Sequence, residues 1–261
     1  MTYRFSRRGF CGLLLLCVTA ASAQDEAVDL VPRWRKGDVC EHKIRTTVRV
    51  RGKLKAGRAR RAFKVELDKQ ATRRDKVLST NEQGLPARIE REYRRLFTTT
   101  VTKISGKTNT KKEIDPSQST TRTLDESRDR PFLVEVLERA IIRKAVRVGD
   151  TWTWKEKGAA RDLGVSELTC KLSEVLTYKG QRTARVHITL KFKGDMGTQG
   201  FEATVRGHVY FSLDAGRIIR SYLKGPVTMK MDGFGPVRGT IREESTLVMV
   251  KAGKEANAER R

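Results

Sequence analysis

The chain has 261 residues, of which 55 are Lys or Arg and 31 are Asp or Glu, so its net charge is +24 at pH 7. This length suits one large β domain or two small ones. The charge favours anionic partners such as lipid head groups, acidic glycans or nucleic acid, although a solvated basic surface is the plainer explanation. No apolar run is long enough for a retained membrane-spanning helix, which excludes a helical integral membrane protein.

The first 23 residues have the three-part layout of a bacterial export signal. A basic start containing Arg7 and Arg8 precedes a short apolar run over residues 11–18, and the small residues Ala21 and Ala23 then fit a cleavage site. The pair Arg7-Arg8 resembles the twin-arginine export motif, and an ordinary basic start is the alternative. We therefore expect an exported protein of the periplasm or cell envelope, delivered by either route.

Strands are predicted for the first half of the mature chain. Apolar and charged side chains alternate from Val39 to Val50 and again from Phe63 to Leu67, which is the period of a half-buried strand. Residues 51–61 look like a basic loop between them, and residues 88–104 look like one or two further strands. Residues 107–125 are polar with little to bury, so we expect a long loop or a poorly ordered strand pair there.

One helix is predicted, over about residues 130–144. Apolar side chains recur at i, i+3 and i+4 spacing from Phe132 to Ile141. Ser127 or Asp129 can accept the free N–H groups at its start, and Pro131 suits its first turn. We expect the apolar stripe of this helix to pack against a sheet.

Alternating apolar positions return in the second half of the chain. They predict strands over residues 168–172, 184–192, 203–213, 227–231 and 241–250, again with a period of two. The predicted fold class is therefore mainly β, as a curved antiparallel sheet or half barrel with one packed helix.

Two segments of the chain echo each other. Arg35-Lys36-Gly37-Asp38 and Arg147-Val148-Gly149-Asp150 each open a strand series, and glycine turns at Gly84 and Gly216 each lead into a basic strand with a tyrosine. Either a weak duplication or a coincidence of common turn residues explains this pattern. We expect one β-rich domain over residues 24–251, with two related halves at about 30–115 and 146–251 joined by 116–145, and then a disordered tail at 252–261.

Three segments of the second half carry a resemblance to a family. Residues 148–152 read Val-Gly-Asp-Thr-Trp, residues 178–180 read Tyr-Lys-Gly, and residues 211–217 read Phe-Ser-Leu-Asp-Ala-Gly-Arg. Together with Trp34 and Gly37-Asp38 they resemble a family of exported, β-rich bacterial proteins to which no activity is assigned. In fold, such proteins are similar to periplasmic lipoprotein carriers, in which a curved antiparallel sheet wraps around a helix. That second likeness implies a shape and not a function.

No catalytic, cofactor-binding or metal-ligating motif stands out, and we assign no residue to those roles. His187 and His208 are predicted one diagonal step apart on the polar face of neighbouring strands, where they could share a metal ion or an anion. Two ligands make a poor zinc site, and two solvated histidines are the alternative. Ser221 and Lys224 match the Ser-x-x-Lys spacing of penicillin-recognising enzymes, but on a strand they would point to opposite faces.

Two further features bear on stability and on partners. Cys40 and Cys170 lie on the apolar faces of their strands, and they either pair across a loop of about 130 residues or remain separate buried thiols. Six cations crowd one predicted hairpin and form a candidate anion-binding patch: Arg51, Lys53, Lys55, Arg58, Arg60 and Arg61.

The sequence therefore favours a non-catalytic envelope protein that binds an apolar or lipid-like ligand between helix and sheet, or an anionic surface through its basic face. A structural or assembly protein held on the envelope by its charge stays open, as does an enzyme whose site is built from scattered residues. The expected partners are a lipid-like ligand or an anionic envelope polymer, with peripheral membrane contact. Nucleic acid is a poor fit because few stacking aromatic residues accompany the predicted basic patch.

Overall fold

A computed structural model describes residues 26–56, 59–82, 84–115, 122–125, 137, 140–155, 165–196, 199–230 and 237–252. The candidate export residues Arg7, Arg8, Ala21 and Ala23 lie outside this part of the chain. The capping candidates Ser127 and Asp129, the residue Pro131 and most of the predicted tail lie outside it as well.

The described residues are mostly strands. Their bounds are β1 Val28–Leu30, β2 Val39–Ala56, β3 Ala59–Thr80, β4 Pro86–Ile104, β5 Lys107–Asp115, β6 Arg122–Asp125, β7 Arg143–Val146, β8 Thr151–Trp154, β9 Val165–Tyr178, β10 Gln181–Met196, β11 Gln199–Ser212, β12 Arg217–Lys230 and β13 Val237–Lys251.

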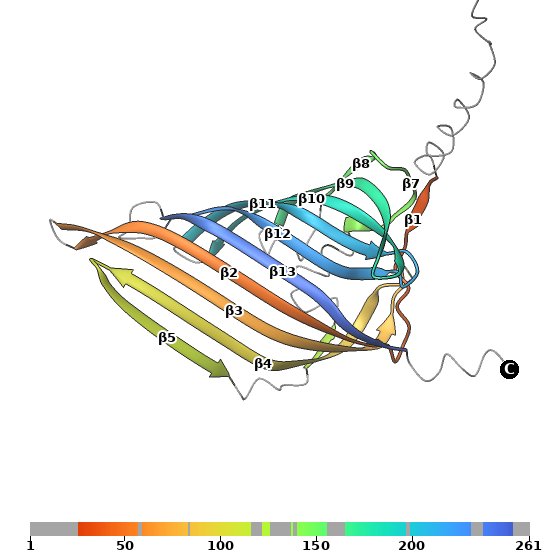
Figure 1. Cartoon of the computed structure of the whole chain (residues 1–261), viewed down its shortest axis with the longest axis horizontal. Coiled ribbons are helices and arrows are strands. Elements are labelled where there is room, and N and C mark those ends of the chain that lie inside the picture. Colours follow the sequence, from red (N-terminus) through yellow and green to blue (C-terminus); the bar gives the residue numbers. More distant parts are fainter. Residues whose placement is uncertain are drawn as a thin grey trace, which may run out of the picture.

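Eleven of these strands form one curved, open antiparallel sheet (Figure 1). Its order is β5-β4-β3-β2-β13-β12-β11-β10-β9-β8, with β6 paired to β4. Most neighbours are joined by hairpins, whereas the last strand, β13, returns to pair with β2 along thirteen register positions from Arg238 to Lys251. The predicted mainly β class with a curved antiparallel sheet is confirmed.

One predicted loop is wrong, and of the two alternatives predicted for residues 107–125 the strands are found rather than the long loop. β2 continues to Ala56 and β3 begins at Ala59, so most of the predicted basic loop over 51–61 is paired strand. Lys107–Asp115 pairs with β4 from Ile104 back to Leu96, where a long loop was one of the two expectations. Cross-strand backbone hydrogen bonds and the β-branched threonines of β4 stabilise these segments without the apolar burial that the sequence pattern detects.

The predicted helix ends earlier than expected. Leu137, Ala140 and Ile141 are helical and buried, whereas Arg143–Val146 forms β7 and pairs with β1 in a separate two-stranded sheet. The side-chain oxygen Oδ1 of Asp29 accepts a hydrogen bond from the Ala145 N–H at 2.8 Å, which holds this pairing. The described helical residues do pack on the large sheet, because the Trp152 Nε1–H donates to the Ala140 carbonyl at 2.8 Å.

The main hydrophobic core lies between these helical residues and β9 to β12. Leu168, Cys170, Val186, Ile188 and Leu190 are fully buried there, together with Leu137 and Ile141 of the helix. A second, smaller cluster joins Trp34, Cys40, Val77 and Ile89 near the other end of the sheet. The apolar stripe predicted over residues 184–192 is therefore the centre of the core.

Glycines allow backbones of neighbouring strands to approach closely across the middle of the sheet. A Cβ atom at Gly207 would lie 1.8 Å from the Tyr222 carbonyl oxygen, and one at Gly225 would lie 1.9 Å from that of Thr204. Only glycine fits such an approach, and glycine kinks of this kind are a recognised source of sheet curvature.

Candidate binding faces of the sheet

The sheet has two faces of opposite chemistry. Cross-strand partners share a face, so the register assigns side chains to an inward face, on which the helical residues pack, or to an outward face. The inward face carries Val186, Val209 and Ser221, and the outward face carries Arg206, Lys224 and Arg242. Ser221 is buried and Lys224 exposed, so their predicted opposite orientation is confirmed and no Ser-x-x-Lys site forms.

The inward face of β2, β3, β4 and β13 holds a buried charge cluster that consists of His42, Arg73, Asp75, Arg91 and Glu243. The guanidinium of Arg91 is 2% exposed and binds Asp75 with two hydrogen bonds, at 2.7 and 3.0 Å. The Arg73 Nε lies 3.0 Å from Oδ2 of the same carboxylate, the oxygen that Arg91 Nη2 also binds. Two arginines thus share one aspartate away from water, an arrangement that needs close pairing to be tolerated.

Electrostatics within the cluster favour the charged carboxylate and the neutral histidine. Burial opposes ionisation of Asp75, but Arg73 and Arg91 outweigh it and lower the pKa of that carboxyl. Burial, followed by repulsion from Arg73, lowers the pKa of His42 to about 3. Burial raises the pKa of Glu243, against the opposing attraction of Arg73 and a hydrogen bond from Thr46.

A second buried ion pair, near this cluster, links the start of β12 to the turn that precedes β2. The Arg217 Nη2 donates to Asp38 Oδ2 at 3.2 Å, and both side chains are almost fully buried. The same guanidinium lies over the ring of Trp34, 4.2 Å from its centroid, where a cation–π contact adds to the ion pair.

Further along β2 and β3, the inward face becomes an apolar shelf that consists of Val48, Val50, Phe63, Val65 and Leu67. Val48 pairs with Leu67, and Val50 pairs with Val65. All five side chains are half-buried, and none belongs to either of the two core clusters. The shelf and the buried charge cluster lie on the same face, separated along β2 by Ile44 and Thr46.

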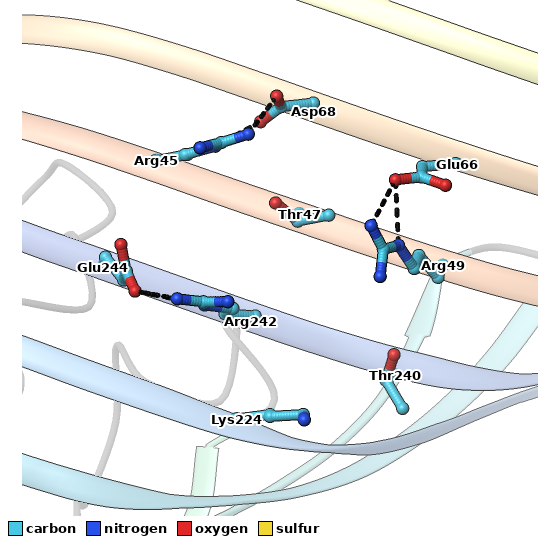
Figure 2. A pocket seen from close by; sticks show the side chains of 9 residues that line it. All are labelled: Arg45, Thr47, Arg49, Glu66, Asp68, Lys224, Thr240, Arg242 and Glu244. Atoms are coloured by element: carbon cyan, nitrogen blue, oxygen red, sulfur yellow. Dashed lines mark hydrogen bonds and ion pairs between the residues drawn. The ribbon is translucent and has the colours of Figure 1, made fainter.

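The outward face holds a shallow polar groove of about 250 Å³ across β2, β3, β12 and β13, shown in Figure 2. Arg45 binds Asp68 at 2.9 and 2.8 Å, and Arg49 binds Glu66 at 2.9 and 2.7 Å. Arg242 pairs with Glu244 of its own strand. Thr47, Thr240 and Lys224 complete the lining.

The predicted anion patch is divided by the sheet. Arg51 and Lys53 are exposed on the outward face, where Lys64 and Arg238 lie opposite Arg51 on the neighbouring strands. Arg61 pairs with Leu54 and takes the alternate, inward register position. Arg58 and the side chains of Lys55 and Arg60 lie outside the described residues.

Neither cysteine forms a disulfide, and the two are buried in separate clusters. Cys40 lies on β2 and Cys170 on β9, with four strands between them in the sheet order. The predicted disulfide alternative is therefore wrong for this structure, and the alternative of two buried thiols holds. Burial raises the pKa of Cys170 to about 12, so this thiol is unreactive at neutral pH.

His187 and His208 are direct cross-strand partners, closer than the predicted diagonal step. The hairpin that joins β10 and β11 is tighter than expected, which shifts the register by two residues. Their rings lie 5.1 Å apart in an edge-to-face contact. Among the described residues no third side chain completes a metal site. Burial, followed by Arg185 and His187, lowers the pKa of His208.

Sequence reasoning missed the buried charge cluster entirely. Arg73 and Asp75 occupy inward positions of β3, but they interrupt the apolar alternation that identifies an inward face. Their register with His42 and Cys40 could be assigned only once the β2–β3 hairpin was placed. One signal was available in the sequence: Arg73 and Asp75 occupy alternate positions that continue to Val77, and therefore share a strand face with an apolar residue.

No known protein family matches the chain, and no curated protein matches it. Among solved structures, the fold is similar to lipovitellin, in a structure described as showing its lipid–protein interactions, with a TM-score of 0.48 and 10% sequence identity. The alignment covers 85% of this chain and 26% of the lipovitellin chain, so this chain spans about a quarter of that protein. No helix in the described part of the chain is long and apolar enough to cross a membrane.

Proposed function

We propose that this protein is a non-catalytic, exported binding protein that holds a lipid-like ligand on the inward face of its sheet. The apolar shelf is the observation that carries this proposal. The export signal read from residues 1–23 supports delivery to the periplasm or cell envelope.

The shelf offers apolar surface that the chain itself leaves partly open. Each half-buried valine or leucine still exposes apolar area, and covering it stabilises a complex by about 25 cal/mol per Å². From His42 to Val50 the strand rises by about 26 Å. A bilayer core of about 30 Å holds two layers of acyl chains, so an extended acyl chain fits along this stretch of β2.

The polar end of the shelf suits an anionic head group. Lys69 is exposed and pairs with Thr46 on the inward face, between the shelf and the buried charge cluster. A ligand with an acyl chain on the shelf would place its head group beside Lys69, where an anion is favoured.

The first experiment is native mass spectrometry of the full protein purified from its own cell envelope, compared with the same sample denatured. We expect extra mass that disappears on denaturation and corresponds to a lipid-like molecule. Leu67→Gln, on the shelf, should lose this mass. Glu66→Gln, on the outward face of the same strand, is the matched control and should keep it.

Two outcomes would contradict the proposal. A wild-type protein of bare mass would mean that no ligand is carried tightly. Equal retention of the ligand by both variants would place it elsewhere. Circular dichroism of Leu67→Gln separates loss of binding from loss of folding.

A further inference from the structure

The outward face carries a line of like charges on three adjacent strands. Arg206 of β11 lies opposite Lys224 of β12, which in turn lies opposite Arg242 of β13. We call these three residues the cation row. Like charges that face each other directly across strands destabilise a sheet.

Carboxylates neutralise only one member of this row. Arg242 pairs with Glu244 along its own strand, as Figure 2 shows. Arg206 and Lys224 are exposed, and neither pairs with a carboxylate among the residues that the structure describes. The row therefore presents a concentrated positive charge to the solvent, at the rim of the polar groove.

A second row of rings runs beside the first. His187 of β10, His208 of β11 and Tyr222 of β12 are successive cross-strand partners. We call them the ring row, and it lies two residues from the cation row, or about 7 Å along each strand. All three rings are half-buried, and the Nδ1 atom of His208 is itself buried, so among the histidines it is His187 that offers polar atoms to a ligand.

We propose that these two rows bind an acidic polysaccharide that crosses the strands. Carboxylates or sulfates of the polymer would lie over Arg206, Lys224 and Arg242. Sugar rings and hydroxyls would lie over the ring row, where the Tyr222 hydroxyl and the His187 imidazole would donate and accept hydrogen bonds. Thr47 and Thr240 extend the supply of hydroxyl partners along the groove.

The ring contacts favour a sugar polymer over a nucleic acid. Stacking of bases requires open aromatic faces. The guanidinium of Arg242 lies over the ring of Tyr222, 5.1 Å from its centroid. His187 and His208 contact each other edge to face. One face of Tyr222 and one face of a histidine are therefore occupied, which disfavours the stacking of bases and suits a hydroxyl-rich anionic chain.

This surface is independent of the proposed lipid-like ligand, because it lies on the opposite face of the sheet. It also differs from the patch predicted at Arg51 and Lys53, which lies on the same face without a ring row. Replacing Arg51 and Lys53 by glutamine therefore serves as a control, because it changes the net charge by as much as the same replacement at Arg206 and Lys224.

The test is calorimetric titration with polygalacturonate, with a neutral dextran and an oligothymidylate as comparison ligands, at about 50 mM and about 200 mM salt. We expect wild type to bind polygalacturonate, to bind dextran undetectably, and to bind less tightly at the higher salt. The double variant Arg206→Gln/Lys224→Gln should bind about tenfold more weakly. Arg51→Gln/Lys53→Gln should change the Kd by less than about threefold.

A ring variant makes the test independent of charge. Tyr222→Leu should weaken the binding of polygalacturonate while its net charge and salt dependence stay unchanged. Three results would overturn the proposal: no binding of polygalacturonate by wild type, equal loss in the two charge variants, or tighter binding of the oligothymidylate. Thermal unfolding of each variant confirms that these exposed substitutions leave the fold intact.

Discussion

The inward face of this sheet is stabilised in two different ways along its width. On β9 to β12 it is apolar, and Ile188, Leu190 and Val209 are fully buried against the helical residues. On β2 to β4 the same face buries Arg73, Asp75 and Arg91 in place of apolar side chains. Apolar burial is non-directional and tolerates small shifts, whereas a buried ion cluster is stable only in one geometry. The first region therefore gives the fold its stability, and the second restricts its register.

The turns at residues 35–38 and 147–150 have the same local hydrogen bonds but differ in burial. The backbone N–H of Arg35 donates to Asp38 Oδ2 at 3.1 Å, and that of Arg147 donates to Asp150 Oδ2 at 2.9 Å. The N–H of each aspartate returns a hydrogen bond to the arginine carbonyl at 3.1 Å. Asp38 is buried and also binds Arg217, whereas Asp150 is exposed. The side chain of the turn aspartate thus has a long-range partner at only one of the two positions.

The largest expected effect comes from removing the shared carboxylate of the buried charge cluster. Asp75→Asn leaves two buried guanidinium groups without their counter-charge and should lower the free energy of unfolding by about 3–5 kcal/mol. Asp68→Asn breaks an exposed pair on the outward face of the same strand and should cost no more than about 1 kcal/mol. Urea denaturation measures both, and similar costs would contradict the difference between the two faces.

A truncation in each apolar region distinguishes core from shelf. Leu190→Ala empties a fully buried site and should cost about 2–5 kcal/mol. Leu67→Ala removes a half-buried side chain, so its cost in the ligand-free protein should be closer to about 1 kcal/mol. A loss at Leu67 as large as that at Leu190 would show that the shelf is packed core, and it would weaken the proposed ligand site.

Acid should destabilise the protein through His42 before it protonates Asp75. The pKa of His42 is lowered to about 3, so the unfolded chain binds more protons than the folded one between that value and about 6.5. Stability is therefore lost as pH falls through this window, by about 3 kcal/mol between pH 6.5 and pH 4. His42→Gln should remove this slope.

Wild type and His42→Gln share all other titratable groups. The difference between their pH profiles of stability therefore isolates the contribution of His42. The pKa of Glu243 is raised, so its ionisation costs stability as pH rises and has the opposite sign. The pKa of Asp75 is lowered, so its contribution is lost only as pH falls below its ordinary range. Equal pH dependence of the two proteins would show that His42 is not the group responsible.

The smallest expected effects concern the two turns. Asp38→Asn keeps the turn but weakens the buried pair with Arg217, and it should cost about 2 kcal/mol. Asp150→Asn keeps the same turn at an exposed position and should cost about 0.5 kcal/mol or less. Thermal unfolding measures the loss of stability in both variants. Equal losses would contradict the long-range role assigned to Asp38.

The sequence by itself determined most of the long strands and their division into two faces. These features depend on local alternation and turn chemistry, which a strand or turn carries in its own residues. Alternation placed Cys40 on the apolar face of β2 and identified the apolar strand at 184–192, and both predictions are confirmed. Alternation did not detect the polar strand at 107–115, because that strand buries too little to show a period.

Tertiary structure alone decided which distant residues meet. The pairing of β13 with β2 brings Glu243 near Arg73. The pairings of β12 with β11 and β13 put Lys224 in one row with Arg206 and Arg242. The contact of Arg217 with Asp38 joins residues 179 positions apart. Cross-strand register depends on hairpin tips and glycine approaches that no single strand encodes. The residues of the shelf, the buried charge cluster and the cation row were therefore all visible in the sequence, but their association was not.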